Sequence, residues 1–183
     1  MTSTPLWQPT AAAIAASNLQ RFRDFVNQRH GLALADYPAL YDWSVEQIEL
    51  FWPALWDFCA VRASKRWDQA LQDGDKMPGA RWFTGSRLNF AENLLRRRDA
   101  ADALVFRGED GISRRISFAE LYQVVAQLAA TLRQLGIQPG DRVVGFMPNL
   151  PQTVIAMLAA TSIGAVWSSC SPDFGIQGVL DRF

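Results

Sequence analysis

The sequence predicts an α/β protein, in which a helical, aromatic-rich N-terminal segment is followed by an incomplete α/β sheet domain. Strand-like and helix-like stretches alternate from Ile116 to Phe183, and this alternation is typical of a parallel or mixed sheet. Six of the seven tryptophans lie in the first hundred residues, where apolar side chains recur at helical spacing. We therefore expect a helical segment over residues 1–100 and the start of a sheet domain over residues 101–183.

The composition is that of a folded, globular protein. Of the 183 residues, 49% are hydrophobic and 20% are charged, and 18 basic side chains balance 18 acidic ones. A formal net charge of zero argues against a dedicated nucleic-acid-binding protein. We interpret the basic run Arg96–Arg98 as a solvated helix end. Cys59 and Cys170 stand far apart without histidine neighbours, so we expect free, buried thiols and no zinc site.

The N-terminus lacks the pattern of a secretory signal. Met1–Thr10 is polar and contains two prolines, and Ala11–Ala16 is too short and too weakly apolar for a signal or a membrane span. We expect a cytoplasmic protein with neither a membrane nor a nucleic acid as its partner.

The N-terminal segment contains two helical patterns. Apolar spacing predicts one helix over Ala11–His30, ended by Gly31. Ser44 and Gln47 form a capping-box pattern that predicts the start of a second helix. Pro53 falls inside this second pattern, where it either kinks the helix or restarts it.

A short helix and a β-hairpin are expected around the boundary between the N-terminal segment and the sheet domain. Asn89 begins a capping-box pattern and predicts a short helix through Leu95. Two apolar stretches, Leu104–Phe106 and Ile112–Ile116, flank a glycine-rich tetrapeptide and predict a β-hairpin.

The clearest capping box in the chain lies within the predicted sheet domain. Ser117 is expected to open a long helix that Gly136 closes. Val143–Met147 predicts an inner strand, and Asn149 is expected to cap a buried, alanine-rich helix. A last helix, Phe174–Phe183, has no closing signal, so we interpret the sequence as the front part of a larger enzyme.

Polar residues follow two of the predicted strands. These strand ends are Pro148–Asn149 and Ser168–Asp173, and the second contains three hydroxyls, a thiol and a carboxylate. Ligands of open α/β sheets collect at the carboxyl ends of strands, so this stretch is a candidate pocket wall. The alternative is purely structural: Ser171 would be the N-cap and Pro172 the first residue of the last helix.

Several common catalytic patterns are missing from the sequence. It contains no G-x-S-x-G, no H-E-x-x-H, no G-x-G-x-x-G and no glycine-rich phosphate loop ending in lysine. From the residues alone, the interpretation ends at the opening half of an α/β enzyme.

Four motifs in the sheet domain resemble the opening motifs of adenylate-forming enzymes, the superfamily of acyl-CoA synthetases, luciferases and peptide-synthetase adenylation domains. These motifs are Ile116–Leu121, Gly140–Val143, Met147–Asn149 and Ile163–Val166. Trp82–Phe83 with Leu88, Asn89 and Asn93 resembles the segment before this domain in the acetyl-CoA synthetase branch. Leu50–Cys59 and Ser168–Gly175 look like the acetoacetate–CoA ligases, which are acid–thiol ligases. The resemblance covers essentially the whole chain.

The resemblance implies a two-step reaction. ATP, with Mg²⁺ offsetting phosphate charge, would convert acetoacetate to an acyl-adenylate with release of pyrophosphate. The thiol of CoA would then displace AMP and form acetoacetyl-CoA for lipid metabolism. Acetoacetate, ATP and CoA are therefore the expected small-molecule partners.

The resemblance assigns no catalytic residue to this chain. The family's phosphate loop and its catalytic lysine lie downstream of residue 183, so the chain alone is expected to be inactive. By position, Ser171, Pro172 and Asp173 correspond to a substrate-binding loop near the CoA thiol channel, although the Phe-Gly-Gly of the acetyl-CoA branch is absent. The alternatives are a fragment of an acetyl- or propionyl-CoA synthetase and a non-catalytic α/β binding module.

Overall fold

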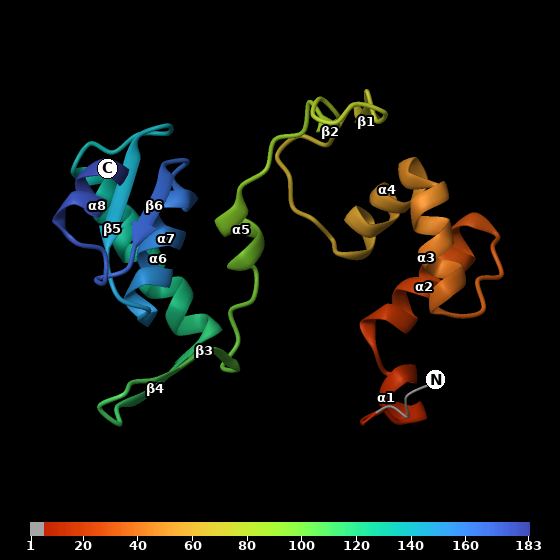
Figure 1. Cartoon of the computed structure of the whole chain (residues 1–183), viewed down its shortest axis with the longest axis horizontal. Coiled ribbons are helices and arrows are strands. Elements are labelled where there is room, and N and C mark those ends of the chain that lie inside the picture. Colours follow the sequence, from red (N-terminus) through yellow and green to blue (C-terminus); the bar gives the residue numbers. More distant parts are fainter. Residues whose placement is uncertain (1–5) are drawn as a thin grey trace. The chain divides into compact units, whose positions relative to one another are not determined.

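The computed structural model describes residues 6–183. The chain forms two compact units (Figure 1). The first unit extends to Val61 and takes in Lys65–Ser86, and the second contains Arg62–Ser64 and Arg87–Phe183. Residues 1–5, part of the polar N-terminal stretch that argues against a secretory signal, lie outside the described residues. No helix within residues 6–183 is long and apolar enough to cross a membrane.

The first unit begins with two helices where the sequence predicts one. These are α1 (Ala11–Ala15) and α2 (Asn18–His30). The prediction of a single helix was wrong because Ser17 takes an extended backbone and its hydroxyl accepts a hydrogen bond from the Gln20 N–H. Gly31 ends α2 in the left-handed region, with φ 65°, as predicted.

Helices α3 (Tyr37–Glu46) and α4 (Ile48–Phe58) follow. The predicted cap at Ser44 was wrong: this residue lies inside α3, and its hydroxyl donates to the Tyr41 carbonyl. Asp36 caps α3 instead, by accepting a hydrogen bond from the Ala39 N–H. Pro53 lies within a continuous α4, so the helix does not restart there.

Aromatic packing holds the first unit together. Its buried core, drawn from α2, α3 and α4, consists of Phe22, Val26, Leu40, Trp43 and Ala54. A short antiparallel pair, β1 (Gln69–Gln72) and β2 (Arg81–Thr84), was missed because the sequence between residues 72 and 81 reads only as a polar connector. Ring contacts join β2 to α4, with Trp82 at 5.4 Å from Trp52 and Phe83 at 4.8 Å from Trp56.

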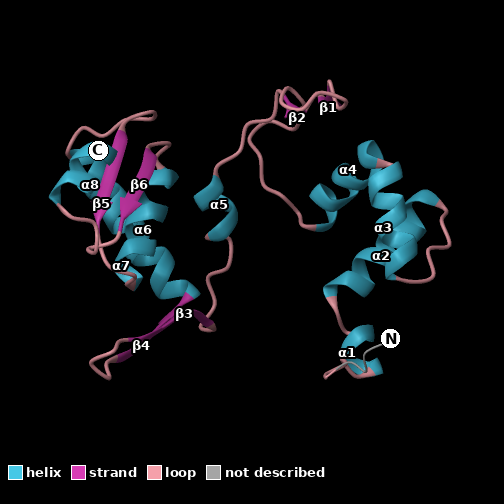
Figure 2. Cartoon of the chain, viewed as in Figure 1, coloured by secondary structure: helices cyan, strands magenta, loops and turns pink. Residues whose placement is uncertain are grey.

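The second unit contains a short helix, a hairpin and an α/β core (Figure 2). The predicted caps at Asn89 and Ser117 and the predicted hairpin are confirmed. The elements are α5 (Phe90–Leu94), β3 (Asp102–Arg107), β4 (Ser113–Ser117), α6 (Phe118–Gln134), β5 (Arg142–Phe146), α7 (Pro151–Ser162), β6 (Val166–Cys170) and α8 (Ile176–Arg182).

The last two helices begin later than predicted. The Asn149 side chain does not cap α7, whose N-cap is Leu150 with Pro151 in the first turn. The N-cap of α8 is Gly175, so the predicted capping role of Ser171 and Pro172 was wrong. The stretch expected to be a loop from Ser168 onward continues β6 as far as Cys170.

The core of the second unit forms around α7. This helix packs against α6 and β6, and within Pro151–Ser162 only Gln152 is exposed. Alanines such as Ala159 and Ala160, both fully buried, allow neighbouring elements to approach closely. The larger buried side chains of this core are Leu95, Ile116, Leu121, Val125, Leu158 and Ile163.

We predict that Leu158→Ala lowers the free energy of unfolding of the second unit by ~2–5 kcal/mol, because it empties a buried site. Leu158 is 3% exposed, whereas Gln152 on the same helix is exposed. Gln152→Ala is therefore the matched control and should change stability by less than about 0.5 kcal/mol. Chemical denaturation measures both; equal effects would show that α7 is not the core helix.

Candidate functional site

The candidate site lies at the carboxyl ends of two parallel strands. β5 and β6 lie side by side (Figure 1), with Phe146 opposite Cys170 at their ends. The Met147 N–H donates to the Cys170 carbonyl at 3.1 Å, so the pairing of β5 with β6 continues one residue beyond the end of β5. The two polar strand ends noted in the sequence therefore lie at the same edge of the sheet. Ligands bind at this edge in open α/β sheets.

Ser171, Pro172 and Asp173 form a tight turn after β6. The Ser171 hydroxyl donates to Asp173 Oδ2 at 2.8 Å and accepts a hydrogen bond from the Asp173 N–H at 3.3 Å. The Phe174 N–H donates to the Ser171 carbonyl at 3.1 Å and closes the turn. All three residues are exposed, so the remaining oxygen atoms of Ser171 and Asp173 can meet a ligand.

A cavity of about 510 Å³ lies beside the end of β5. The β3–β4 turn supplies one wall and the loop after β5 supplies the other, and the acidic residues Glu109 and Asp110 face it from the turn. Asn149, which the sequence places at a strand end, lines this cavity, whereas Ser171–Asp173 do not. Sequence reasoning missed the contribution of the hairpin, because its turn carries only the composition of a surface connection.

Neither a metal-binding cluster nor a disulfide is found in the part of the chain that the structure describes. Within residues 6–183 no cluster of three or more His, Cys, Asp or Glu side chains is positioned to hold a metal ion. Neither cysteine forms a disulfide bond within the described residues; Cys170 is buried, as predicted, whereas Cys59 is exposed, so the prediction that Cys59 is buried was wrong.

The basic run Arg96–Arg98 is exposed and directly follows the end of α5, which agrees with the predicted solvated helix end, and two of its side chains make specific contacts. Arg97 forms two hydrogen bonds with Asp99, at 2.9 and 3.0 Å, and stacks 4.2 Å from the Phe118 ring. Arg98 stacks 3.6 Å from the Tyr122 ring. The hydrogen bond from Arg97, helped by the Ala101 N–H, holds the pKa of Asp99 below its ordinary value of 3.8.

Comparison with known families matches both parts of the chain. The family described as "AMP-binding enzyme" matches residues 90–181, and the family described as "Acetyl-coenzyme A synthetase N-terminus" matches residues 37–94. The first match covers half of the chain and takes in the strand ends described above.

Similar proteins come from bacteria, vertebrates and fungi. An acetoacetyl-coenzyme A synthetase of Rhizobium meliloti (strain 1021) is 51% identical over 98% of this chain, and one of Xenopus tropicalis is 45% identical over all of it. A malonamoyl-CoA synthetase of Penicillium aethiopicum is 36% identical over 97% of the chain. The chain spans 25% to 27% of the length of these three relatives.

A solved structure shares the fold. The acetoacetyl-CoA synthetase from Streptomyces lividans superposes with a TM-score of 0.89 and is 46% identical, with 99% of this chain and 28% of that chain covered. The predicted α/β architecture with a helical, aromatic-rich N-terminus is therefore confirmed as the N-terminal part of this enzyme fold.

We predict that Arg97→Gln raises the pKa of Asp99 toward 3.8, because the strongest hydrogen bond to its carboxylate is lost. Since folding lowers this pKa, the stabilisation from Asp99 is present above its ordinary pKa and disappears as the pH falls through the folded value. An NMR titration of the Asp99 carboxyl group measures the shift. Arg133→Gln, at an exposed position on α6, should leave the titration unchanged.

Proposed function

Because the chain belongs to the family of AMP-binding enzymes, we propose that its parent protein is an acetoacetate–CoA ligase. The chain is homologous to about a quarter of these enzymes, so the activity belongs to the parent protein. The observation that carries the proposal is the identity of 43% to 51% with relatives named as acetoacetyl-CoA synthetases, which extends over both units.

The proposed reaction joins a carboxylic acid to a thiol. A carboxylate is a poor electrophile because its charge is delocalised, so AMP transfer from ATP first supplies a good leaving group. Mg²⁺ would offset phosphate charge in this step, and the CoA thiol would then displace AMP. The family resemblance places the phosphate loop and the catalytic lysine downstream of residue 183. Because the chain matches about a quarter of the length of its relatives, we expect the chain by itself to be inactive.

Ser171, Pro172 and Asp173 are the proposed contribution of this chain to substrate binding. Their support is positional: the turn follows β6 at the ligand-binding edge of the sheet and leaves its hydroxyl and carboxylate oxygens exposed. These oxygens suit the amide N–H groups of the pantetheine arm of CoA. The internal hydrogen bonds of the turn would fix both groups before CoA arrives.

The domain assignment and the location are further parts of the proposal. Residues 1–100 would form the helical N-terminal segment and residues 101–183 would begin the AMP-binding domain. The parent protein would act in the cytoplasm on soluble substrates. The alternative of an acetyl- or propionyl-CoA synthetase is favoured by one specific observation, the match of residues 37–94 to an acetyl-CoA synthetase N-terminus.

We predict that the intact parent protein has a higher kcat/KM for acetoacetate than for acetate. Acetoacetate carries an additional acetyl group that would make additional contacts, and since even one methylene in a hydrophobic pocket is worth about 10- to 200-fold, the preference should be at least of this order. Acyl-CoA formation with each acid, at saturating ATP and CoA, measures the ratio. A higher value for acetate would move the assignment to the acetyl-CoA branch.

We predict that Ser171→Ala and Asp173→Asn raise the KM for CoA by about 2- to 12-fold, the equivalent of one hydrogen bond worth ~0.5–1.5 kcal/mol. Because CoA enters only the second step, acid-dependent pyrophosphate exchange should be unchanged. Ser169→Ala, at an exposed position on β6, is the matched control. An unchanged KM for CoA in both turn variants would remove these residues from the CoA site.

A further inference from the structure

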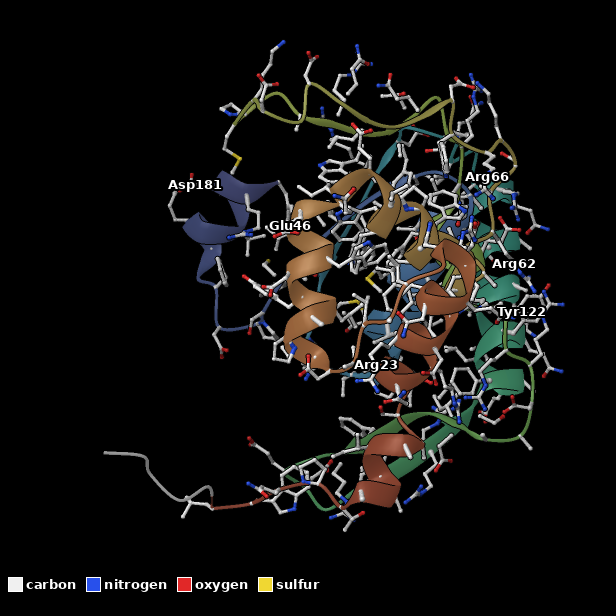
Figure 3. All side chains as sticks on the ribbon, turned by 90° about the vertical axis from the view of Figure 1, so that its right-hand side faces the viewer. Arg23, Glu46, Arg62, Arg66, Tyr122 and Asp181 are labelled. Atoms are coloured by element: carbon white, nitrogen blue, oxygen red, sulfur yellow. The ribbon has the colours of Figure 1, made fainter. Side chains whose placement is uncertain are left out.

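A second polar cavity lies within the second unit, and the mechanism proposed above does not use it. It has a volume of about 330 Å³ and lies where α5, the start of α6 and the end of α7 meet. Figure 3 shows Arg62 and Tyr122 on the same margin of the molecule, and both line this cavity. The other polar lining residues are Asn89, Glu92, Arg98 and Ser162.

The cavity lies at the opposite edge of the strand pair from Ser171–Asp173. Helix α7 begins beside the carboxyl end of β5 and runs back to Ser162, from which the chain soon enters the start of β6 at Val166. Ser162 therefore marks the amino-terminal edge of the strands. The cavity and the Ser171–Asp173 turn are consequently separate places on this unit.

Two arginines at the cavity are held in place without neutralisation of their charge. The backbone of Arg62 is fixed by Asn93, whose side chain accepts from the Arg62 N–H at 2.8 Å and donates to the Arg62 carbonyl at 2.9 Å. The Arg98 guanidinium is stacked 3.6 Å from the Tyr122 ring. In the part of the chain that the structure describes, neither guanidinium forms an ion pair.

Of the remaining polar side chains that line the cavity, two are bonded to the backbone and one is available to bind a ligand. Asn89 donates to the Thr161 carbonyl at 2.8 Å and accepts from the Glu92 N–H, and the Ser162 hydroxyl donates to the Ala159 carbonyl. These two side chains therefore build the wall. The Glu92 carboxylate has no ion-pair partner among the described residues, so it remains available as an acceptor beside the two arginines.

We propose that this cavity binds a small phosphate monoester that carries hydroxyl groups. Two guanidinium groups supply planar sets of N–H donors that match the oxygens of a phosphate. One carboxylate beside them would accept hydrogen bonds from the hydroxyls, which gives the lining a net charge of one positive unit. The volume of the cavity lies at the lower end of the range for small-molecule sites, about 300–1,000 Å³. The inference does not depend on which acid the parent protein activates.

Hydrogen–deuterium exchange of the intact parent protein tests the site directly, because it locates binding along the chain. Ribose 5-phosphate and inorganic phosphate are the two probes. Both should slow exchange across residues 90–98 and 118–124. Arg62→Gln keeps both backbone bonds to Asn93, so it should weaken each probe at least tenfold without unfolding α5. Arg98→Gln should do the same, and Arg133→Gln is the exposed control on α6.

A second variant separates the phosphate from the hydroxyl groups. Glu92→Gln should weaken ribose 5-phosphate about five- to tenfold and leave inorganic phosphate as tight or tighter, because a negative charge is removed. Protection confined to other segments, or protection here that survives both arginine substitutions, would overturn the proposal. Stronger binding of ribose 5-phosphate to the Glu92→Gln variant would overturn the role of the carboxylate. Circular dichroism of each variant confirms that the helices remain folded.

Discussion

The parallel pairing of β5 with β6 is the constraint on which the second unit depends. Two parallel neighbours cannot be joined by a tight turn, so the chain must cross over, and α7 makes this crossing. The crossover returns the chain to the amino-terminal edge while both carboxyl ends remain together at the other edge. This single requirement explains both the buried character of α7 and the meeting of the two polar loops.

Covering α7 requires contacts from outside the strand pair. Helix α6 supplies one side, and α5 contacts it from another part of the sequence. Asn89 fixes the second contact, since its side chain caps α5 and also donates to carbonyls at the end of α7. Four residues further along α5, Asn93 holds the backbone of Arg62 in the same way. The five-residue helix α5 and its N-cap thereby connect two segments that are distant from each other in sequence, Arg62 and the end of α7.

Helix starts could be predicted from the sequence where the capping hydrogen bond joins residues close in sequence. The prediction was wrong where more than one nearby polar side chain could form the cap. Ser117 was predicted to cap α6 because its hydrogen bond to the Glu120 N–H joins residues three apart. Ser44 carries the same pattern, yet Asp36 starts the helix eight residues earlier and places Ser44 in its last turn. Ser171 also looks like a cap, but its hydroxyl bonds the nearer Asp173. The cavity at Arg62 was unpredictable, since its lining comes from residues as far apart as 62 and 162.

The motifs that identify the family mainly build the fold, and this explains what the chain reveals about its chemistry. Gly164 has φ 82°, and a side chain there would lie 3.1 Å from the Pro139 ring. The Gly140 N–H donates to the Gly164 carbonyl at 2.9 Å, so two of the recognisable motifs meet where β5 and β6 begin. Substitution at Gly164 would strain the backbone and push apart the starts of both strands. This constraint arises from the backbone geometry alone. These motifs therefore identify the enzyme family through the fold that they build.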